Sequence, residues 1–362
     1  MNEEKLIYAS TEKSADMLYF AKMNIPDPFF AFTHGGKKCA LMSPLEFGRA
    51  AKQSDFDTLY PSGPRSDAEE LAKLLRKLGV GGVEVPSSFP VSEYLALKGL
   101  GVRISVCGGE FFPQRRVKDE REIAEIKKAN AAAAASYARV VQILREAEEN
   151  GGALLWRSKP LTSETLKYEI ELACLAMGAS SEHTIAAGGD QACDPHNEGS
   201  GPIRARELLV VDIFPRMKSS GYFGDMTRTF IKGRPTDAQA RIVSTVRKAQ
   251  LDAISRIRAG AIGASVHSAV AGFFEREGFG TEFEGGAWRG FFHSTGHGIG
   301  LEVHEEPRLG RQKNALAENE VVTVEPGLYY PGVGACRIED NVRVLKDGCE
   351  ILSDFNYDWI ID

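Results

Sequence analysis

The chain has 362 residues, of which 43% are hydrophobic and 26% are charged, with 44 Lys and Arg against 50 Asp and Glu and a net charge of −6. The length predicts more than one domain, and the composition excludes disordered, collagen-like and coiled-coil architectures. The acidic balance offers no basic surface to a nucleic-acid backbone, so we expect no nucleic-acid partner. No apolar run approaches the roughly 18 residues of a membrane span, so we also expect no membrane association.

The beginning of the sequence and its cysteines indicate a reducing compartment. The first residues are polar and acidic, which is not the pattern of a secretory signal. The six cysteines are scattered, without a CxxC pair or the dense spacing of a disulfide scaffold. We therefore expect a cytoplasmic protein with free cysteines.

Residues 1–112 have the pattern of a small α/β domain. Two apolar runs around a Gly-Gly pair predict a β-hairpin over about 28–42. A helix with Ser66 or Asp67 as its N-cap is expected to run to Leu78. The next expected elements are a strand at 83–85, a helix at 91–98 and a strand at 102–106. Such alternation indicates a sheet covered by helices.

Residues 113–362 are expected to form the second domain. It opens with a long Ala-rich helix over about 119–149, whose five alanines at 131–135 indicate close packing against a neighbour. The elements expected after it are a helix at 163–177, strands at 184–187, 208–214 and 223–231, helices at about 236–259 and 264–277, and strands at 299–304, 321–324 and 336–345. This order predicts an α+β architecture, with a curved mixed sheet backed by helices.

Two pairs of acids share one arrangement in the second domain. Asp212 ends an apolar strand and Asp225 follows thirteen residues later, while Glu325 ends another apolar strand and Glu339 follows fourteen residues later. A turn containing Gly lies within each pair, so two similar hairpins are predicted to bring the four carboxylates together as a pseudo-symmetric pair. Buried carboxylates in that number require cationic neutralisation.

A histidine between glycines lies between the two acid pairs. The glycines of Gly296-His297-Gly298 allow a close approach of the backbone, and neutral imidazole is a common metal ligand. Four carboxylates and one histidine suit two divalent cations about 3.5–4 Å apart. Oxygen-rich ligation favours Mn²⁺ or Co²⁺ and tolerates Zn²⁺ or Fe²⁺. Arg228 and Arg337 could neutralise at most two acids, and we expect them to support the site.

These segments resemble the pita-bread metallopeptidases, a family that includes prolidase, aminopeptidase P and methionine aminopeptidase. The resemblance covers about 113–362 and rests on the segments 221–229, 296–305, 324–329 and 337–340. It implies a pita-bread catalytic domain in which two divalent metal ions, Mn²⁺ first among them, activate a water molecule for peptide hydrolysis. Carried over to this sequence, the implied metal ligands are Asp212, Asp225, His297, Glu325 and Glu339, with Asp225 and Glu339 bridging both ions.

The resemblance also implies roles for residues around the metals. Glu325 would carry a proton to the leaving nitrogen. His304 or His293 would stabilise the oxyanion, and His196 is a further catalytic and substrate-binding candidate. Arg308 matches a position that binds the C-terminal carboxylate of a substrate in prolidases, which would favour dipeptides; a surface ion pair with a neighbouring glutamate is the alternative.

Five further residues are expected either to support the metal ligands or to have a structural role only. Tyr222 and Thr227 match residues that orient the carboxylate ligands. His34, His183 and His267 have no motif around them, and we interpret them as structural.

The N-terminal domain favours the proline-directed branch, prolidase or aminopeptidase P, because methionine aminopeptidases usually lack such a domain. The resemblance implies that residues 1–112 form a creatinase-like α/β domain that shapes the substrate mouth and takes part in oligomerisation. It further implies a homodimer that acts on proline-containing dipeptides or short peptides. The junction 116–123 also resembles this branch.

The sequence departs from the family pattern around the first acid pair. The spacing from Asp212 to Asp225 is two residues wider than usual, the usual Gly after Asp212 is absent, and His196 lies one residue closer to Asp212. An insertion of two residues preserves the facing of a strand, so we expect an intact metal site and an altered substrate mouth.

Several functions stay open at this point. We favour an Xaa-Pro dipeptidase slightly over an aminopeptidase P that acts on longer peptides. The altered loop allows a non-peptide hydrolase or a lyase on the same scaffold. A non-catalytic binding module is disfavoured, because the complete set of five ligands is present.

Overall fold

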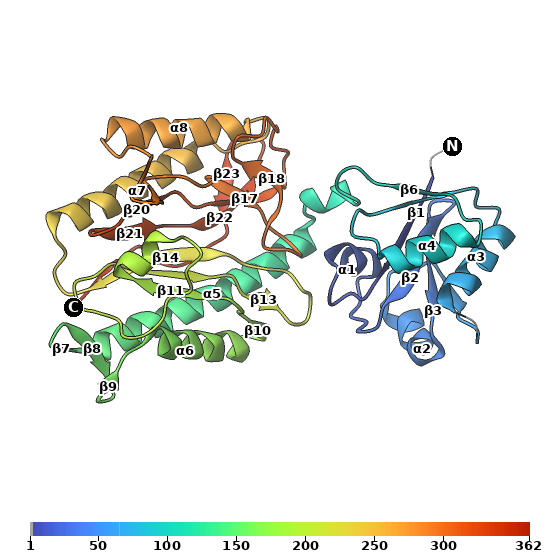
Figure 1. Cartoon of the computed structure of the whole chain (residues 1–362), viewed down its shortest axis with the longest axis horizontal. Coiled ribbons are helices and arrows are strands. Elements are labelled where there is room, and N and C mark those ends of the chain that lie inside the picture. The colour runs from blue at the N-terminus through green and yellow to red at the C-terminus, as the bar shows by residue number, and fades with distance from the viewer. Residues whose placement is uncertain (1–2, 65) are drawn as a thin grey trace. The chain divides into compact units, whose positions relative to one another are not determined.

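The computed structural model describes residues 3–64 and 66–362. The chain divides into two compact units, Met1–Arg115 and Arg116–Asp362 (Figure 1). Among the described residues, no helix combines the length and the apolar character that a membrane span needs.

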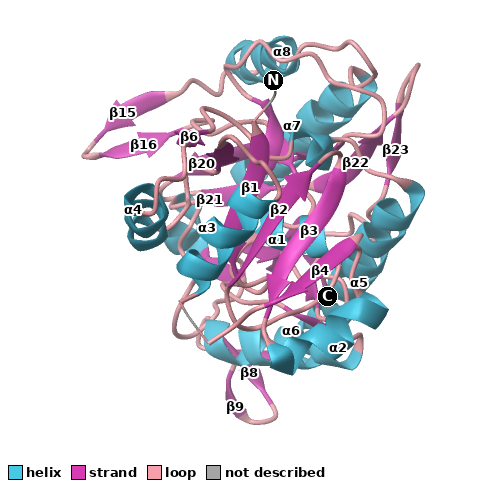
Figure 2. Cartoon of the chain, turned by 90° about the vertical axis from the view of Figure 1, so that its right-hand side faces the viewer, coloured by secondary structure: helices cyan, strands magenta, loops and turns pink. Residues whose placement is uncertain are grey.

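The N-terminal unit is a six-stranded mixed sheet with the strand order β4-β3-β2-β1-β5-β6 (Figure 2). Its strands are β1 (Glu4–Ala9), β2 (Phe29–His34), β3 (Lys37–Met42), β4 (Thr58–Pro61), β5 (Val83–Val85) and β6 (Ile104–Val106), and its helices are α1 (Ala15–Ala21), α2 (Pro44–Gln53), α3 (Asp67–Lys77) and α4 (Val91–Gly99). Successive side chains of a strand face opposite sides. Accordingly, Leu6 and Phe30 pack with α3 and α4, whereas Ile7 and Ala31 pack with α1 and α2.

Local signals in this unit are confirmed. Strands β2 and β3 pair as an antiparallel hairpin, and Gly35 and Gly36 at its turn have φ of +58° and +78°. Such angles favour glycine and match the twist of a two-residue hairpin. Helix α3 begins after Ser66, whose hydroxyl accepts from the backbone N–H of Glu69 while the Glu69 carboxylate accepts from the N–H of Ser66.

The second unit consists of two halves with the same order of elements, two helices followed by three antiparallel strands. The first half contains α5 (Glu120–Glu146), α6 (Ser163–Ala176), β11 (Ile185–Gly188), β12 (Leu209–Ile213) and β14 (Met226–Lys232). The second half contains α7 (Asp237–Ser255), α8 (Gly263–Arg276), β17 (Gly296–Gly298), β19 (Val321–Val324) and β22 (Asp340–Val344). The two main sheets have the orders β11-β12-β14-β24 and β18-β17-β19-β22-β23.

Shorter elements complete this unit. They are β7 (Glu148–Asn150), β8 (Ala153–Trp156), β9 (Lys159–Pro160), β10 (Ala179–Ser180), β13 (Arg216–Met217), β15 (Glu282–Glu284), β16 (Ala287–Arg289), β18 (Glu305–Leu309), β20 (Gly327–Tyr330), β21 (Gly334–Arg337), β23 (Cys349–Ile351), β24 (Ile360–Ile361) and a 3₁₀ turn at Gly189–Cys193. A further 3₁₀ turn covers Pro113–Arg116.

The two predicted acid-bearing hairpins are confirmed. Strands β12 and β14 pair in register without a break, with Asp212 opposite Thr227. Strands β19 and β22 pair in the same antiparallel manner, with Val324 opposite Asp340. The loop between β12 and β14 carries β13, which pairs with β10. The β12–β14 pairing is continuous beside this loop, as an insertion of an even number of residues would allow.

The Ala-rich helix packs closely against the sheet of its own half. Ala129, Ala132 and Ala133 of α5 are fully buried. A Cβ added at Gly224 would lie 2.7 Å from the carbonyl carbon of Ala129, closer than atoms pack. The Tyr137 hydroxyl also donates from α5 to the sheet, at 2.9 Å from the carbonyl oxygen of Val211. The predicted close packing of this helix is confirmed.

Three predicted elements are wrong in their bounds. The helix predicted to 149 ends at Glu146, because residues 148–150 pair with β8 as a hairpin. The segment 299–304, predicted as a strand, is a loop, because the backbone N–H groups of Leu301 and Glu302 donate to the Glu305 side chain instead of to a neighbouring strand. The strand predicted over 336–345 is two strands, β21 paired with β20 and β22 paired with β19.

Candidate metal centre

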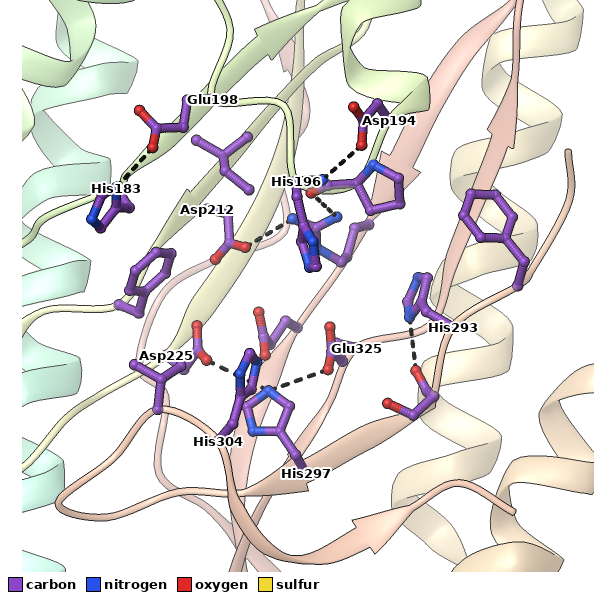
Figure 3. Close-up of a pocket in the computed structure, with 18 of the residues that line it drawn as sticks. His183, Asp194, His196, Glu198, Asp212, Asp225, His293, His297, His304 and Glu325 are labelled. Atoms are coloured by element: carbon purple, nitrogen blue, oxygen red, sulfur yellow. Dashed lines mark hydrogen bonds and ion pairs between the residues drawn. The ribbon is translucent and has the colours of Figure 1, made fainter. Parts of the chain in front are cut away.

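The four predicted acids come from equivalent places in the two halves. Asp212 lies in β12 and Asp225 directly before β14, while Glu325 follows β19 and Glu339 directly precedes β22. The halves meet here, because the N–H of Glu339 donates to the carbonyl oxygen of Thr227 at 3.0 Å. Strand ends from both sheets therefore direct their carboxylates into one space (Figure 3).

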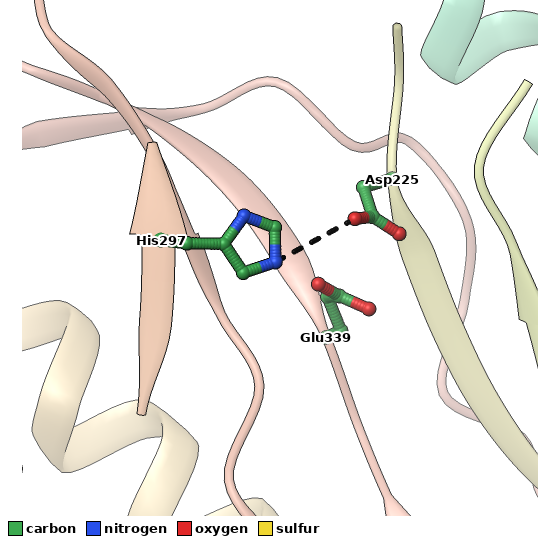
Figure 4. Close-up of side chains that lie close together, drawn as sticks. All are labelled: Asp225, His297 and Glu339. Atoms are coloured by element: carbon green, nitrogen blue, oxygen red, sulfur yellow. Dashed lines mark ion pairs between the residues drawn. The ribbon is translucent and has the colours of Figure 1, made fainter. Parts of the chain in front are cut away.

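The histidine of β17 completes this cluster. Ligand atoms of Asp225, His297 and Glu339 lie within 4.8 Å of one another (Figure 4). His297 Nε2 lies 3.9 Å from Asp225 Oδ2 and 3.3 Å from Glu325 Oε1. All five residues predicted as ligands line one cavity of about 760 Å³.

Glycine is required on both sides of His297. A Cβ added at Gly296 would lie 1.9 Å from the carbonyl oxygen of Thr323 on β19, and one added at Gly298 would lie 2.2 Å from that of Glu306 on β18. The short strand thus lies close to both neighbours and presents His297 between them. The expected close approach of the backbone around this histidine is confirmed.

The donor atoms of this cluster fit a divalent cation. Asp212 Oδ1, Asp225 Oδ1 and Glu339 Oε1 are buried and have no hydrogen-bond partner in the described chain. A buried carboxylate oxygen without a donor is costly, and a bound cation removes that cost. The chemistry of the set, hard oxygens and one imidazole, suits the divalent ions expected from the sequence.

The raised pKa values of three of the acids show that their ionised forms are unfavourable when no cation is bound. Burial and then repulsion by Glu339 raise the pKa of Asp225 well above its usual value. Burial and then repulsion by Glu325 do the same to the pKa of Glu339. Burial raises the pKa of Glu325 to about 7, although Arg337 opposes the shift.

His297 is held neutral with a lone pair toward the acids. Burial and then the neighbouring His304 lower the pKa of His297 to about 3. Its Nδ1 lies 3.1 Å from the carbonyl oxygen of Gly298, which can only accept, so the proton is on Nδ1 and the lone pair is on Nε2. That lone pair faces the Glu325 carboxylate at 3.3 Å, an arrangement that needs a cation or a proton between the two atoms.

Arg337 and Thr227 support the acids. Arg337 Nη2 lies 2.8 Å from Asp212 Oδ2, and its Nε donates to Thr227 Oγ1 at 3.3 Å. The Thr227 hydroxyl in turn donates to Glu339 Oε2 at 2.6 Å. Arg228 lies behind the site instead, where its Nη2 is 2.9 Å from Asp340 Oδ1. Within the described part of the chain, the Tyr222 hydroxyl donates to Glu122 on α5 and to none of the four acids, so its expected role was wrong.

The candidate accessory residues all line the cavity. His293 is bonded at both nitrogens, Nδ1 to the Ser294 carbonyl oxygen at 2.8 Å and Nε2 to the Tyr329 hydroxyl at 2.9 Å. The His304 ring lies perpendicular to the His297 ring, with 4.4 Å between their centroids. His196 is exposed at the opening, and Arg308 Nε is 4.0 Å from Glu306 Oε1.

The structure adds residues that the sequence did not single out. Tyr329 is buried between His293 and Arg337, whose Nη1 donates to the Tyr329 hydroxyl at 2.9 Å. The sequence offered one signal for Tyr329, its place four residues after Glu325 in the same segment. A buried tyrosine so close to the site needs a partner for its hydroxyl. His183, interpreted as structural, lines the cavity with its Nδ1 2.9 Å from Glu198 Oε1. His267 lies outside the lining and is bonded to Thr295 Oγ1 at 3.0 Å.

The chain resembles known proteins both in sequence and in fold. Residues 124–346 match the model of metallopeptidase family M24. The Xaa-Pro dipeptidase of Pyrococcus furiosus is 26% identical over an alignment that covers 97% of each chain. Two solved structures also resemble this chain. An X-Pro aminopeptidase from Thermotoga maritima matches with a TM-score of 0.86 and 26% identity, and the match covers 99% of this chain and 97% of that one. An Xaa-Pro dipeptidase from Bacillus anthracis matches with a TM-score of 0.87 and 26% identity, and the match covers 99% of this chain and 95% of that one.

Proposed function

Because the chain belongs to metallopeptidase family M24, we propose that it uses divalent metal ions to hydrolyse the bond before proline in Xaa-Pro dipeptides. The observation that carries this proposal is the cavity in which four carboxylates and a neutral histidine meet, with three buried carboxylate oxygens that lack donors. The dipeptidases and the aminopeptidase that resemble the chain along nearly its whole length support the same reaction class.

The proposed metal ligands are Asp212, Asp225, His297, Glu325 and Glu339, which would hold two divalent ions, with Mn²⁺ as the first candidate and Co²⁺, Zn²⁺ or Fe²⁺ as alternatives. When bound, such ions lower the pKa of a ligated water toward about 7 and so supply hydroxide at neutral pH. Glu325 is the least buried of the four acids, with 16% of its side chain exposed toward the cavity. We assign to it the transfer of a proton to the leaving proline nitrogen.

His304 is better placed than His293 to stabilise the oxyanion. The Nδ1 proton of His293 is used by the Ser294 carbonyl, and its Nε2 is occupied by the Tyr329 hydroxyl. No hydrogen bond within the described chain occupies the ring nitrogens of His304, and burial lowers the pKa of that ring, which keeps it neutral. A neutral imidazole N–H is a suitable donor to a developing oxyanion.

The substrate class follows from Arg308 and from the chemistry of proline. An Xaa-Pro bond has no N–H, so a peptidase cannot position it through an amide donor and depends on polarising the carbonyl. Arg308 lines the cavity, and among the described residues its guanidinium has only a long contact with Glu306, so it is available to a substrate carboxylate. Such a contact favours dipeptides, and His196 at the opening is a further substrate-binding candidate.

A second candidate function is cleavage of longer Xaa-Pro peptides, favoured by the similarity to the Thermotoga maritima aminopeptidase. The test is an assay of purified protein, stripped of metal and reloaded with Mn²⁺, on Xaa-Pro dipeptides beside Xaa-Pro-Yaa tripeptides. We expect free proline from the dipeptides and a slower reaction with the tripeptides. A Mn²⁺-loaded protein that releases no proline would overturn the proposal, and faster tripeptide cleavage would favour the aminopeptidase.

We further propose a homodimer in the cytoplasm, with the N-terminal unit contributing to assembly and to the substrate mouth. These features are supported by the family resemblance alone. Size-exclusion chromatography with light scattering tests the dimer, for which we expect twice the mass of one chain.

A further inference from the structure

A buried ion pair lies beside the metal centre but outside the cavity lining. Lys118 Nζ and Glu305 Oε2 are 3.0 Å apart, and their side chains are 1% and 6% exposed. Lys118 belongs to the segment 116–123 that precedes and begins α5, and Glu305 begins β18 directly after His304. Neither side chain has a role in the proposed reaction.

The Glu305 carboxylate closes the loop that precedes it. Its Oε1 accepts from the backbone N–H groups of Leu301 at 2.9 Å and Glu302 at 3.1 Å. A Cβ added at Gly300 would lie 2.8 Å from Glu305 Oε2, so the carboxylate lies inside the turn. A carboxylate buried in this way is costly unless its charge is neutralised, and Lys118, at 3.0 Å from Oε2, contributes neutralising charge.

This loop bears directly on the metal centre. His304 at its end packs against His297, with 4.4 Å between the ring centroids. The carbonyl oxygen of Gly300 at its start accepts from the N–H of Phe223 at 2.8 Å, two residues before Asp225. The adjoining Tyr222 is bonded to Glu122 in the first turn of α5. The segment around the start of α5 therefore contacts two of the loops that carry side chains into the cavity.

We propose that Lys118 is a positioning residue that, by neutralising Glu305, holds the 300–304 loop closed and fixes His304 beside the metal centre. The consequence for catalysis rests on the proposed peptidase function. The consequence for the loop can be measured without substrate.

Two double variants separate the positioning role from simple stability. Removing Lys118 alone would take a neutralising charge away from a buried carboxylate and could unfold the protein. K118M/E305Q and K118M/E305A both remove the charge pair. They differ in whether a side-chain oxygen remains to accept from Leu301 and Glu302. The control is K127M, which removes a lysine of α5 from an exposed contact with Glu350.

Hydrogen exchange of a peptide spanning 299–305 is the first measurement. We expect faster exchange in K118M/E305A, near wild-type exchange in K118M/E305Q and K127M, and no change in peptides from α7. Steady-state kinetics with an Xaa-Pro dipeptide are the second measurement. We expect kcat to fall about tenfold or more in K118M/E305A and to stay within about threefold in K118M/E305Q, with KM and Mn²⁺ stoichiometry little changed.

The proposal is overturned if both double variants exchange and react like wild type, or if both are impaired equally. A wild-type protein inactive on every Xaa-Pro peptide would refute the proposed function. The exchange comparison would still decide whether Lys118 and Glu305 hold the loop.

Discussion

Arg337 contacts three groups around the metal centre with one guanidinium. It lies 2.8 Å from Asp212, 2.9 Å from the Tyr329 hydroxyl and 3.3 Å from Thr227, and Thr227 donates to Glu339. A planar fork of donors serves several acceptors at once, which a lysine ammonium does less well. Arg337 thus orients two acids directly or through Thr227, and it leaves one buried oxygen of each without a donor, ready for a cation.

Replacing Asp225 tests the centre at the level of a single residue. We expect Asp225→Asn to lower activity by more than about 100-fold and to weaken Mn²⁺ binding, because loss of residues that merely orient ligands already costs 10–100-fold. Activity and metal content by elemental analysis are the measurements. The control is Asp252→Asn, which removes an exposed ion pair with Arg256 on α7. A fully active Asp225→Asn enzyme would contradict the proposed ligand set.

The pKa of Glu325 predicts a pH effect on the metal-free protein. Burial raises this pKa from 4.5 to about 7, so between these values the folded chain holds a proton that the unfolded chain has lost. Stability therefore falls as pH rises through this window. We expect the melting temperature of metal-free wild type, relative to Glu325→Gln, to fall between pH 4.5 and 7 and then to level off.

Saturating Mn²⁺ should remove this decline, because the ionised carboxylate is then neutralised by the cation. The measurement is calorimetry of both proteins with and without metal. Buried His293 and His297 have lowered pKa values, so they make the folded protein less stable as pH falls. Both proteins contain these histidines, so the difference between their melting temperatures isolates the effect of Glu325. A difference that does not vary with pH would contradict the assignment.

At the scale of elements, β17 shows how a strand of three residues presents a candidate ligand, His297. Gly296 and Gly298 allow it to lie between β18 and β19 at distances that any side chain would prevent. The His297 N–H also donates to Thr323 Oγ1 at 3.1 Å, which fixes the strand against β19. The imidazole is therefore positioned by backbone packing as much as by its own contacts.

Gly296→Ala tests this packing. A Cβ there would lie 1.9 Å from the Thr323 carbonyl oxygen, so β17 must move away from β19 and take His297 with it. We expect a loss of about 1–3 kcal/mol in the free energy of unfolding and a lower Mn²⁺ affinity. Chemical denaturation and metal titration are the measurements. Gly348→Ala, at a position with nothing within 4 Å of the added carbon, is the matched control.

At the scale of the whole molecule, the candidate metal centre lies where the two halves of one pita-bread domain meet. Asp212 and Asp225 come from the first half, and His297, Glu325 and Glu339 come from the second. The pita-bread fold predicted from the motifs is confirmed by the likeness to solved Xaa-Pro peptidases. A cation held by both halves would bind the folded chain and not the unfolded one, so it should stabilise the fold.

Metal removal should therefore lower the melting temperature. With Mn²⁺ at 100 times its dissociation constant, mass action predicts a gain of about 2.7 kcal/mol per site over the metal-free protein. Scanning calorimetry across a Mn²⁺ titration measures this gain. We expect Asp225→Asn to show a much smaller shift, and an equal shift in both proteins would indicate that the metal binds elsewhere.

The sequence by itself determined most local elements, the α+β class and the five residues that meet in the cavity. These features depend on local sequence signals. The signals are apolar periodicity, the capping pair of Ser66 and Glu69, and acids at the ends of strands. Such signals depend on neighbours within a few residues, so they can be identified without coordinates.

Only the tertiary structure decided which side chains meet across the fold. Thr227 and Glu339 are 112 positions apart, Lys118 and Glu305 are 187 apart, and no spacing rule connects them. For the same reason the 299–304 loop looked like a strand, the bond from Tyr222 to Glu122 was not predicted, and neither was the place of His183 in the cavity lining. Each depends on a partner that folding brings close, because a side chain's role is set by what lies beside it in space.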